Sequence, residues 1–486
     1  MIFIETGITK NTDDIHALTK AFFPGEDVRI TECDHGVEDA SHPVIKHVNS
    51  GYRGKLVYKS DMGAMFETRV EAADRDEMKR SVYEALSLYT GRELPWGSLT
   101  GIRPTRLVRK RIESGMSENE IIADMKKCYF TSEKKTELSI EIAKKELILM
   151  KPVISGNSYS IYADIPFCPT RCLYCSFTSN AVGSDRSLVE AYLEALEKEI
   201  CAMADMMKGR RIDTVYMGGG TPTALLPEEL GRLLKVMRDK FDTARIPEFT
   251  VEAGRPDSIT PEKLEVLREY GVTRISVNPQ TMNQKTLDII GRRHTVEQVK
   301  EAFYMSRKAG FDNINMDIIL GLPGETVADA EKTVGELCKL DPDSLTVHSL
   351  AIKHGSVMKE RLDAAKAEEG TAPEEKAGVD ANKAMETADR GARSLGMSPY
   401  YLYRQKNMSG NLENTGYAKE GKYGLYNILI NEEVQDILAM GAGAISKKVD
   451  SKGNTERSAN YKEVRDYIRG VDDMIERKRK LFEIRP

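Results

Sequence analysis

From residue 159 to residue 350 the sequence alternates short apolar segments with amphipathic helical segments, and this alternation restricts the fold more than any other feature. Apolar strands separated by helices of this length are typical of parallel βα units. The predicted strands are Tyr159–Ile165, Asp213–Met217, Glu248–Glu252, Arg274–Asn278, Asn313–Ile319 and Ser344–Leu350. The predicted helices between them are Arg186–Met207, Pro227–Phe241, Pro261–Tyr270, Val296–Ala309 and Ala328–Leu340. Six units are too few for a closed eightfold barrel, so the sequence predicts an incomplete α/β barrel of the TIM type, (β/α)6.

Three cysteines follow the first of these strands in a Cys-x3-Cys-x2-Cys loop, at Cys168, Cys172 and Cys175. Three thiolates can hold three corners of a [4Fe–4S] cluster and leave the fourth iron without a protein ligand. A structural zinc site with one further donor is the alternative, although zinc sites usually combine two cysteine or histidine pairs and no second pair lies near. Disulfides are disfavoured, because three is an odd number and the chain suits a reducing compartment.

The residues beside these cysteines indicate which family of cluster-binding proteins the chain resembles. The stretch Ile-Pro-Phe-Cys ends at Cys168, and the stretch Tyr-Cys-Ser-Phe begins at Tyr174. With them the chain resembles the radical S-adenosylmethionine (SAM) superfamily and, within it, the oxygen-independent coproporphyrinogen III oxidase group with its heme-chaperone relatives. The resemblance is strongest to the HemZ-type coproporphyrinogen dehydrogenase branch, which also has an N-terminal extension. It implies one [4Fe–4S] cluster on the three cysteines, whose open iron binds SAM, and one or two SAM molecules in all.

Glycines and polar residues occupy the carboxyl ends of the predicted strands, where ligands bind in such barrels. The run at 218–220 leaves bare backbone groups, and Asp317 within an apolar strand is costly without a partner. The resemblance implies SAM contacts at Tyr162, Tyr174, Gly219, Gly220, Thr221, Glu252, Gln280, Arg292, Asp317, Ala351 and Ile445. An ion pair with Arg255 is the alternative role for Glu252. Three histidines near the same predicted mouth are more often structural than catalytic: His294, His348 and His354.

Residues 1–150 are predicted to form an N-terminal α+β domain of unknown role. Its predicted strands lie at 1–5, 55–59 and 66–72, and its helices at 75–90, 118–128 and 133–150. The segment 151–158 indicates a domain joint, after which the barrel is assigned to residues 151–355. An arginine-rich stretch at 100–111 is interpreted as a solvated helix face or, alternatively, as a surface for an anionic ligand or partner.

Residues 356–486 are predicted to form a C-terminal α/β extension that closes the active site. A charged stretch at 363–379 predicts a helix and a surface loop. Tyr400, Tyr401 and Tyr403 beside Arg404 suit a flat macrocycle with carboxylate arms, and ordinary core packing is an equally good account of the tyrosines. The small-residue turn at 440–446, which includes Ile445, resembles a loop that closes on the active site in the oxidase group.

The composition disfavours several other classes of protein. Lys and Arg number 71 against 76 Asp and Glu, and the resulting net charge of -5 gives no general attraction to nucleic acid or to an anionic membrane. The charged N-terminus and the lack of a long uncharged apolar run predict neither a secretion signal nor membrane insertion. Seven cysteines, three of them clustered, suit a reducing compartment, so we expect a cytoplasmic protein.

The resemblance also implies a reaction. In the family a reduced cluster cleaves SAM, and the resulting 5′-deoxyadenosyl radical takes a hydrogen from the β-carbon of a propionate. Loss of carbon dioxide and an electron leaves a vinyl group, so that coproporphyrinogen III becomes protoporphyrinogen IX, with a flavodoxin or ferredoxin as the implied electron donor. The chain departs from the best-studied oxidases at Asp164, where they have histidine, and at Ser176 and Phe177, where they have a further cysteine. The alternatives are a heme-binding chaperone that keeps the cluster and SAM site, and a radical SAM enzyme for another substrate.

Overall fold

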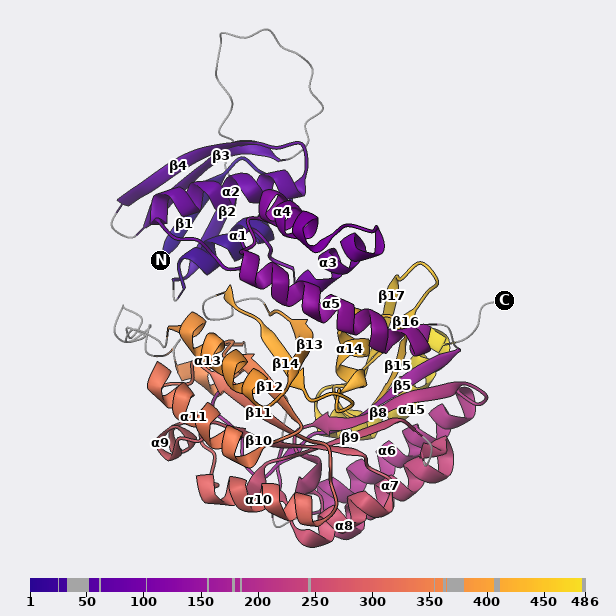
Figure 1. The fold of residues 1–486 in the computed structure, drawn as a ribbon. Coiled ribbons are helices and arrows are strands. Elements are labelled where there is room, and N and C mark those ends of the chain that lie inside the picture. Colours follow the sequence, from indigo (N-terminus) through magenta and orange to yellow (C-terminus); the bar gives the residue numbers. More distant parts are fainter. Residues whose placement is uncertain are drawn as a thin grey trace, which may run out of the picture.

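The structure is a computed structural model of the chain (Figure 1). It describes residues 1–24, 26–32, 52–60, 63–101, 103–154, 157–176, 180–183, 186–243, 246–353, 355–361, 364, 380–405 and 411–482. Phe177, His354 and nearly all of the charged stretch at 363–379 therefore lie outside the described residues.

The chain begins with a small α+β unit that has a hydrophobic core of its own. Its elements are β1 (Ile2–Thr6), α1 (Thr12–Phe22), β2 (Val28–Glu32), β3 (Arg53–Ser60), β4 (Gly63–Glu71) and α2 (Arg75–Thr90). The described strands form a four-stranded sheet in the order β2-β1-β3-β4, in which only β1 and β2 run parallel. Ile2 and Ile4 are buried on one face of β1, as the two-residue period of a strand requires. The sequence predicted β1, β3, β4 and α2, but α1 and β2 were not identified from it.

Three helices connect this unit to the barrel: α3 (Pro104–Glu113), α4 (Glu118–Tyr129) and α5 (Glu133–Ile154). Ser117 and Glu120 form a capping box, which explains why α4 begins where it does. Trp96 is fully buried in the core of these helices, and Leu402 from β13 (Ser398–Tyr403) belongs to the same core. Figure 1 shows α5 lying between the N-terminal sheet and β13, and this helix continues to Ile154, into the segment that the sequence indicated as a joint.

The arginine-rich stretch is divided between solvent and the interior. Arg106 is exposed on α3, as a solvated helix face requires. Arg109 is buried, and its Nη1 lies 2.8 Å from Oε2 of Glu432. Arg103, just before α3, forms an ion pair with Glu433. The stretch is therefore only partly a solvated face, since two of its arginines bind carboxylates of the C-terminal extension.

Six parallel strands form the centre of the fold: β5 (Ser158–Ile165), β8 (Arg211–Gly219), β9 (Glu248–Gly254), β10 (Arg274–Gln280), β11 (Ile314–Leu320) and β12 (Ser344–Ser349). Each strand pairs with the next one in this order. Their centres are fully buried, as Val215, Val251 and Val277 illustrate. Buried parallel strands of this kind need helices on their outer face.

The covering helices are α6 (Ser187–Met206), α7 (Pro227–Phe241), α8 (Pro261–Glu269), α10 (Val296–Lys308) and α11 (Val327–Leu340), with the short helix α9 (Gln284–Ile289) after β10. Figure 1 shows them along one side of the sheet, opposite the N-terminal region. In the described part of the chain the outermost strands of this sheet do not pair with each other, so it stays open. The incomplete α/β barrel predicted from the sequence is confirmed.

The C-terminal residues extend this sheet at both edges. They form α13 (Ala381–Ser394), β13, β14 (Asn414–Ala418), α14 (Leu425–Glu432), β15 (Asp436–Met440), β16 (Ile445–Val449), β17 (Thr455–Ala459) and α15 (Val464–Phe482). β14 lies antiparallel beside β12, and β15 lies parallel beside β5. The described strands thus make one eleven-stranded sheet in the order β13-β14-β12-β11-β10-β9-β8-β5-β15-β16-β17. The sequence indicated an extension, but not these pairings.

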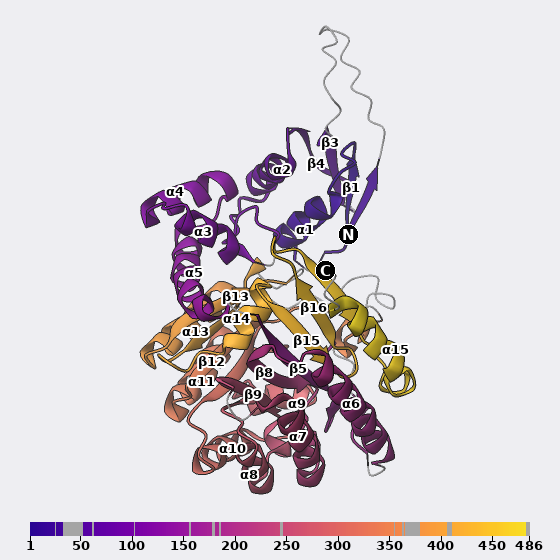
Figure 2. The ribbon, with the colours of Figure 1, turned by 90° about the vertical axis from the view of Figure 1, so that its right-hand side faces the viewer.

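A buried charge pair fixes the last helix to the barrel. α15 lies beside α6, as Figure 2 shows, and Lys478 of α15 forms an ion pair with Glu199 of α6. Both side chains are fully buried. Glu199 also accepts hydrogen bonds from the hydroxyl of Tyr467 at 2.7 Å and from the backbone N–H of Gly441 at 2.8 Å. Four donors therefore satisfy a carboxylate that would otherwise be costly to bury, the fourth being the Asn460 amide at 3.0 Å.

Candidate active site

A cavity of about 600 Å³ opens at the carboxyl ends of the central strands and contains the three cysteines of the motif. Cys168 lies on the short strand β6 (Phe167–Cys168), which pairs with β7 (Asn180–Ala181). Its Sγ is 3.5 Å from Oγ1 of Thr221 in the glycine loop. The loop with the other two cysteines is held by a hydrogen bond from the N–H of Leu173 to the carbonyl of Ile290. The motif is thus built into the wall of the cavity.

The three thiols share the cavity without being gathered round a single point. In the described part of the chain no group of three or more His, Cys, Asp or Glu side chains is placed to hold one metal ion. A mononuclear zinc site needs its sulfur ligands about 2.3 Å from one atom. A cubane cluster binds each thiolate at a different iron corner, so its ligands need not converge in that way. The donor set of three cysteines suits the cluster better than zinc.

The glycine loop at the end of β8 brings bare backbone to the cavity. Gly219 has a φ of +100°, and a Cβ at this position would lie 2.4 Å from a carboxylate oxygen of Asp164. A Cβ on Gly220 would lie 2.6 Å from the carbonyl oxygen of Phe167. Because a side chain would clash at both positions, only glycine allows the loop to pack this closely. Both residues also line the cavity. The N–H of Gly220 donates to the carbonyl of Ile165 at 2.9 Å, so the run is fixed to the strand before the cysteines, and backbone contact with a ligand stays a prediction.

Two half-buried carboxyl groups below this loop, those of Glu252 and Asp164, have raised pKa values. Burial raises the pKa of Glu252, on β9, to about 7, against the lowering effect of the hydrogen bond that Tyr216 donates at 2.5 Å. Burial likewise raises the pKa of Asp164 to about 8, although Tyr162 donates a hydrogen bond to it at 2.9 Å. Glu252 lines the cavity and is therefore a carboxyl that can gain or lose a proton near neutral pH when a ligand arrives.

Gln280 at the end of β10 combines backbone strain with an unused acceptor. Its φ of +66° is in the left-handed region, which a residue with a side chain rarely adopts. The register between β10 and β11 shifts between Val277 and Gln280, which accounts for the local distortion. The buried Oε1 of Gln280 has no hydrogen-bond partner within the described ranges, although the residue lines the cavity. A strained backbone and a buried acceptor without a partner, both at Gln280, indicate that this residue binds a ligand.

Arg292 connects the cysteine loop to β10. Its guanidinium donates to the carbonyl of Asn278 at 2.5 Å and to the hydroxyl of Tyr174 at 3.2 Å. Its buried Nε has no partner among the residues that the structure describes. Arg292 therefore positions the aromatic ring between two of the cysteines and keeps a donor for a ligand.

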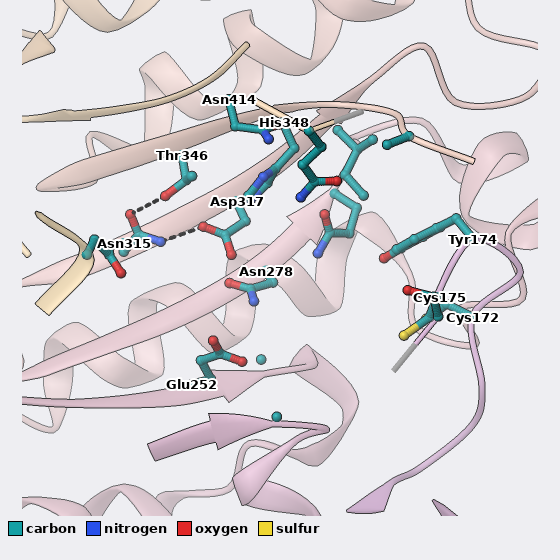
Figure 3. A pocket seen from close by; sticks show the side chains of 18 of the residues that line it. Cys172, Tyr174, Cys175, Glu252, Asn278, Asn315, Asp317, Thr346, His348 and Asn414 are labelled. Carbon is teal, nitrogen blue, oxygen red and sulfur yellow. Dashed lines mark hydrogen bonds between the residues drawn. The ribbon is translucent and has the colours of Figure 1, made fainter. Parts of the chain in front are cut away.

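A polar group around Asp317 lies across the cavity from the cysteine loop, as Figure 3 shows. The amide of Asn315 donates to Oδ1 of Asp317 at 2.6 Å, and Thr346 donates to the amide oxygen of Asn315 at 3.2 Å. His348 lies beside them, and burial lowers its pKa below the usual value. Its Nδ1 is 3.5 Å from the hydroxyl of Tyr403. The partner that Asp317 needs within its apolar strand is thus an amide, which leaves the other carboxylate oxygen for a ligand.

Twelve of the fourteen residues predicted for the site line this cavity: Cys168, Cys172, Tyr174, Cys175, Gly219, Gly220, Thr221, Glu252, Gln280, Arg292, Asp317 and Ala351. Tyr162 and Ile445 are not among its described lining residues. The Tyr162 ring packs beside those of Tyr216 and Tyr426, which stack directly on each other with 4.6 Å between centroids. Ile445 begins β16 and is 44% exposed. The structure therefore brings the strand-end residues together and leaves these two apart.

Three other residues that the sequence analysis discussed have structural roles or lie outside the cavity lining. Arg255 pairs with Asp257 at 2.8 Å, so the alternative ion pair with Glu252 is not formed. His294 is fully buried, and burial lowers its pKa to about 4. Asp164 lies beneath Gly219 and is absent from the described lining of the cavity.

The sequence analysis missed several residues that line the cavity. Asn315 lies two positions before Asp317 on β11 and so shares its face, which is a signal that strand alternation provides. Lys447 comes from a segment after the barrel, and no local pattern indicated it, whereas Arg103 belongs to the arginine-rich stretch at 100–111, whose alternative interpretation was a surface for an anionic ligand or partner.

Comparison with known proteins identifies the family to which the chain belongs. The sequence profile described as "Radical SAM superfamily" matches residues 162–337. The oxygen-independent coproporphyrinogen-III oxidase-like protein HemZ of Bacillus subtilis is 42% identical over 406 residues, which cover 82% of this chain and 79% of that protein. The chain belongs to the radical SAM superfamily, among the oxygen-independent coproporphyrinogen III oxidase-like proteins. Membership of this superfamily implies a [4Fe–4S] cluster and SAM.

Other radical SAM relatives include proteins with two different names. The heme chaperone HemW of Bacillus subtilis is 37% identical over 41% of this chain and 52% of its own length. The oxygen-independent coproporphyrinogen III oxidase of Escherichia coli is 27% identical over 65% of each chain. The solved structure of coproporphyrinogen III oxidase (HemN) from Escherichia coli aligns with a TM-score of 0.45 and 24% identity, covering 68% of this chain and 72% of that one. No helix in the described ranges is long and apolar enough to span a membrane.

Proposed function

We propose that this radical SAM protein oxidatively decarboxylates propionate side chains of coproporphyrinogen III without oxygen, giving the vinyl groups of protoporphyrinogen IX. The observation that carries the proposal is one cavity that is lined both by the three motif cysteines and by strand-end acceptors from β9, β10 and β11. The 42% identical relative is named as a coproporphyrinogen-III oxidase-like protein, which gives the substrate class.

The residues of this cavity fit the two groups that the superfamily implies. We assign the cluster to Cys168, Cys172 and Cys175, and SAM to the residues between them and β11. When bound, these groups would supply radical chemistry that no side chain provides. The protein's own contribution is placement: the close packing of Gly219 against Asp164 and of Gly220 against Phe167 holds the glycine loop in the cavity wall, and the Oε1 of Gln280 offers a buried acceptor.

Glu252 and Asp317 would complete this placement. Two carboxyl groups on neighbouring parts of the wall can accept hydrogen bonds from ribose hydroxyls or from an ammonium group. Because burial holds the pKa of Glu252 near 7, a cationic or hydroxyl ligand would favour its charged form. A one-electron donor of the flavodoxin or ferredoxin type would have to reduce the cluster before each round, and we propose one on chemical grounds.

The substrate end of the cavity fits a macrocycle with acidic arms. Tyr401 and Tyr403 both line it, with their rings nearly parallel at 9° and 6.3 Å between centroids. Aromatic faces suit a flat ring, and the cavity also contains cationic residues that suit carboxylates. These residues belong to the C-terminal extension, which supports the proposal that residues 356–486 close the active site.

The deciding experiment is an anaerobic assay with reconstituted protein, a strong reductant, SAM and coproporphyrinogen III. We expect protoporphyrinogen IX, measured after oxidation by porphyrin fluorescence and chromatography, together with one 5′-deoxyadenosine for each vinyl group. The Cys172→Ala variant should form neither product, whereas Cys201→Ala, which changes a thiol on α6, should behave as the unchanged protein. SAM cleavage without any vinyl porphyrin would refute the proposal.

A heme chaperone is the second candidate function. It is favoured by the name of the HemW relatives, by Asp164, where the best-studied oxidases have histidine, and by Ser176 and Phe177, where they have a further cysteine. A chaperone would bind heme and release it to a partner, with no loss of carbon dioxide from a porphyrinogen. Heme titration of the same reconstituted protein, followed by transfer to an apo-hemoprotein, distinguishes the two.

A further inference from the structure

Two cations from distant segments lie on one wall of the cavity. Arg103 precedes α3, and Lys447 lies on β16. Both bind the same carboxylate, that of Glu433 at the end of α14: Nη1 of Arg103 is 2.9 Å from Oε2, and Nζ of Lys447 is 2.9 Å from Oε1. The two oxygens of one carboxylate are adjacent, so the two cationic groups flank a single point of the wall.

The cationic side chains around Glu433 outnumber the carboxylates that they bind. Arg457 also lies 2.7 Å from Oε1 of Glu433, so three cations meet one anion. Burial alone would raise the pKa of Glu433, but hydrogen bonds from its three partners outweigh that effect and lower the pKa to about 2. Glu433 is therefore charged at any ordinary pH, and an excess of two positive charges remains. A partly buried excess of this kind favours a further anionic group.

The two cavity cations keep hydrogen-bonding capacity for such a group. The buried Nε of Arg103 has no partner among the residues described, while Nη1 serves Glu433. Nζ of Lys447 donates to Glu433 at 2.9 Å and approaches the carbonyl of Ile430 at 3.4 Å, and an ammonium group has three donors. Arg457, by contrast, is 53% exposed and is not among the described residues that line the cavity.

We propose that Arg103 and Lys447 bind a carboxylate arm of the substrate. The inference rests on the proposed function, since coproporphyrinogen III presents propionate carboxylates on a flat ring, and Tyr401 and Tyr403 line the same cavity. The N-terminal region would then contribute to substrate binding, because Arg103 precedes the barrel in the sequence and lines the cavity. Glu433 holds both cations in position before the substrate arrives.

The test is a fluorescence titration of the cluster-loaded full chain with coproporphyrin III, the stable oxidised form of the proposed substrate. Arg103→Gln and Lys447→Gln should each bind about tenfold or more weakly than the unchanged protein, which corresponds to about 1.4 kcal/mol. Arg457→Gln is the matched control, because it removes a cation from the same carboxylate outside the cavity, and its affinity should change by less than about twofold. Arg103→Lys should restore most of the affinity, because it retains the charge.

The methyl ester of the same ligand distinguishes the contribution of charge to binding from the contribution of shape. Coproporphyrin III tetramethyl ester should bind the unchanged protein and both cavity variants equally well, since it has no carboxylates. Thermal unfolding checks that each variant is folded, and if Arg103→Gln does not fold, Lys447→Gln carries the test. Unchanged affinity in the cavity variants, an equal loss in Arg457→Gln, or no binding of coproporphyrin III at all would overturn the inference. Failure of the proposed function would look different: charge-dependent binding would remain, but no vinyl product would form.

Discussion

Replacing Glu252 with glutamine should stabilise the protein without ligands while impairing its site. Burial raises the pKa of Glu252 from 4.5 to about 7, so folding at pH 8 has to remove a charged carboxylate from water. At about 1.36 kcal/mol for each pKa unit, this shift costs about 3 kcal/mol of stability. The sign follows from the direction of the shift: the cost is absent well below pH 4.5, grows between pH 4.5 and about pH 7, where the unfolded chain is ionised and the folded one is not, and is complete above that. Glutamine has the same shape, can still accept the hydrogen bond from Tyr216, and carries no charge at any pH.

We therefore expect Glu252→Gln to raise the thermal midpoint by several degrees at pH 8 and to change it little at pH 5. The measurement is thermal unfolding of ligand-free protein at both pH values, and the matched control is Glu301→Gln, which alters an exposed glutamate of α10. The same variant should bind SAM more weakly, as expected where a functional carboxyl group destabilises the protein that carries it. An equal change in midpoint at both pH values, or a lower midpoint at pH 8, would refute the reasoning.

Three further changes test other parts of the structure. Cys172→Ala should lose most of the iron and sulfide after anaerobic reconstitution while Cys201→Ala keeps both, and equal iron content in the two variants would contradict the cluster assignment. Gln280→Gly relieves a left-handed backbone that costs about 1–2 kcal/mol, so its thermal midpoint should not fall while calorimetry shows weaker SAM binding; unchanged SAM binding would argue against the orphaned acceptor. Lys478→Met leaves a buried carboxylate unpaired and should cost about 3–5 kcal/mol in unfolding experiments, whereas Lys480→Met, on an exposed position of the same helix, should be close to neutral.

The parts of the fold that were predictable have local causes. The bounds of α7, 227–241, were predicted from its leading proline and its apolar spacing, and the structure gives the same residues. The central strands were found because a parallel sheet buried on both faces requires continuous apolar runs. The placement of β15 beside β5 was not found, because Asp436–Met440 and Ser158–Ile165 are separated by most of the barrel and nothing in either segment specifies its neighbour.

The site shows the same division. The cysteines and the glycine run carry their chemistry in their spacing, so the sequence indicated them. The positive φ of Gln280 could not be read from the sequence, because glutamine has no preference for that region and the strain arises from the shifted register of β10. The pKa of Glu252 depends on burial and on Tyr216, two properties that exist only in the folded chain.

The contacts between the N-terminal helices and the C-terminal strands bear on the proposed boundary at residue 150. Nε1 of Trp96 donates to Oε2 of Glu413 at 2.7 Å, and Lys135 forms an ion pair with the other oxygen of that fully buried carboxylate. The guanidinium of Arg404 donates to the carbonyl of Leu99 at 2.7 Å. Removing residues 1–150 would take both donors, Trp96 and Lys135, from the buried Glu413 carboxylate just before β14, at a cost of several kcal/mol, and one acceptor from Arg404 just after β13. The helices α3–α5 therefore support the strands that carry Tyr401, Tyr403 and Asn414 to the cavity, and we expect them to unfold together with the barrel rather than as an independent domain.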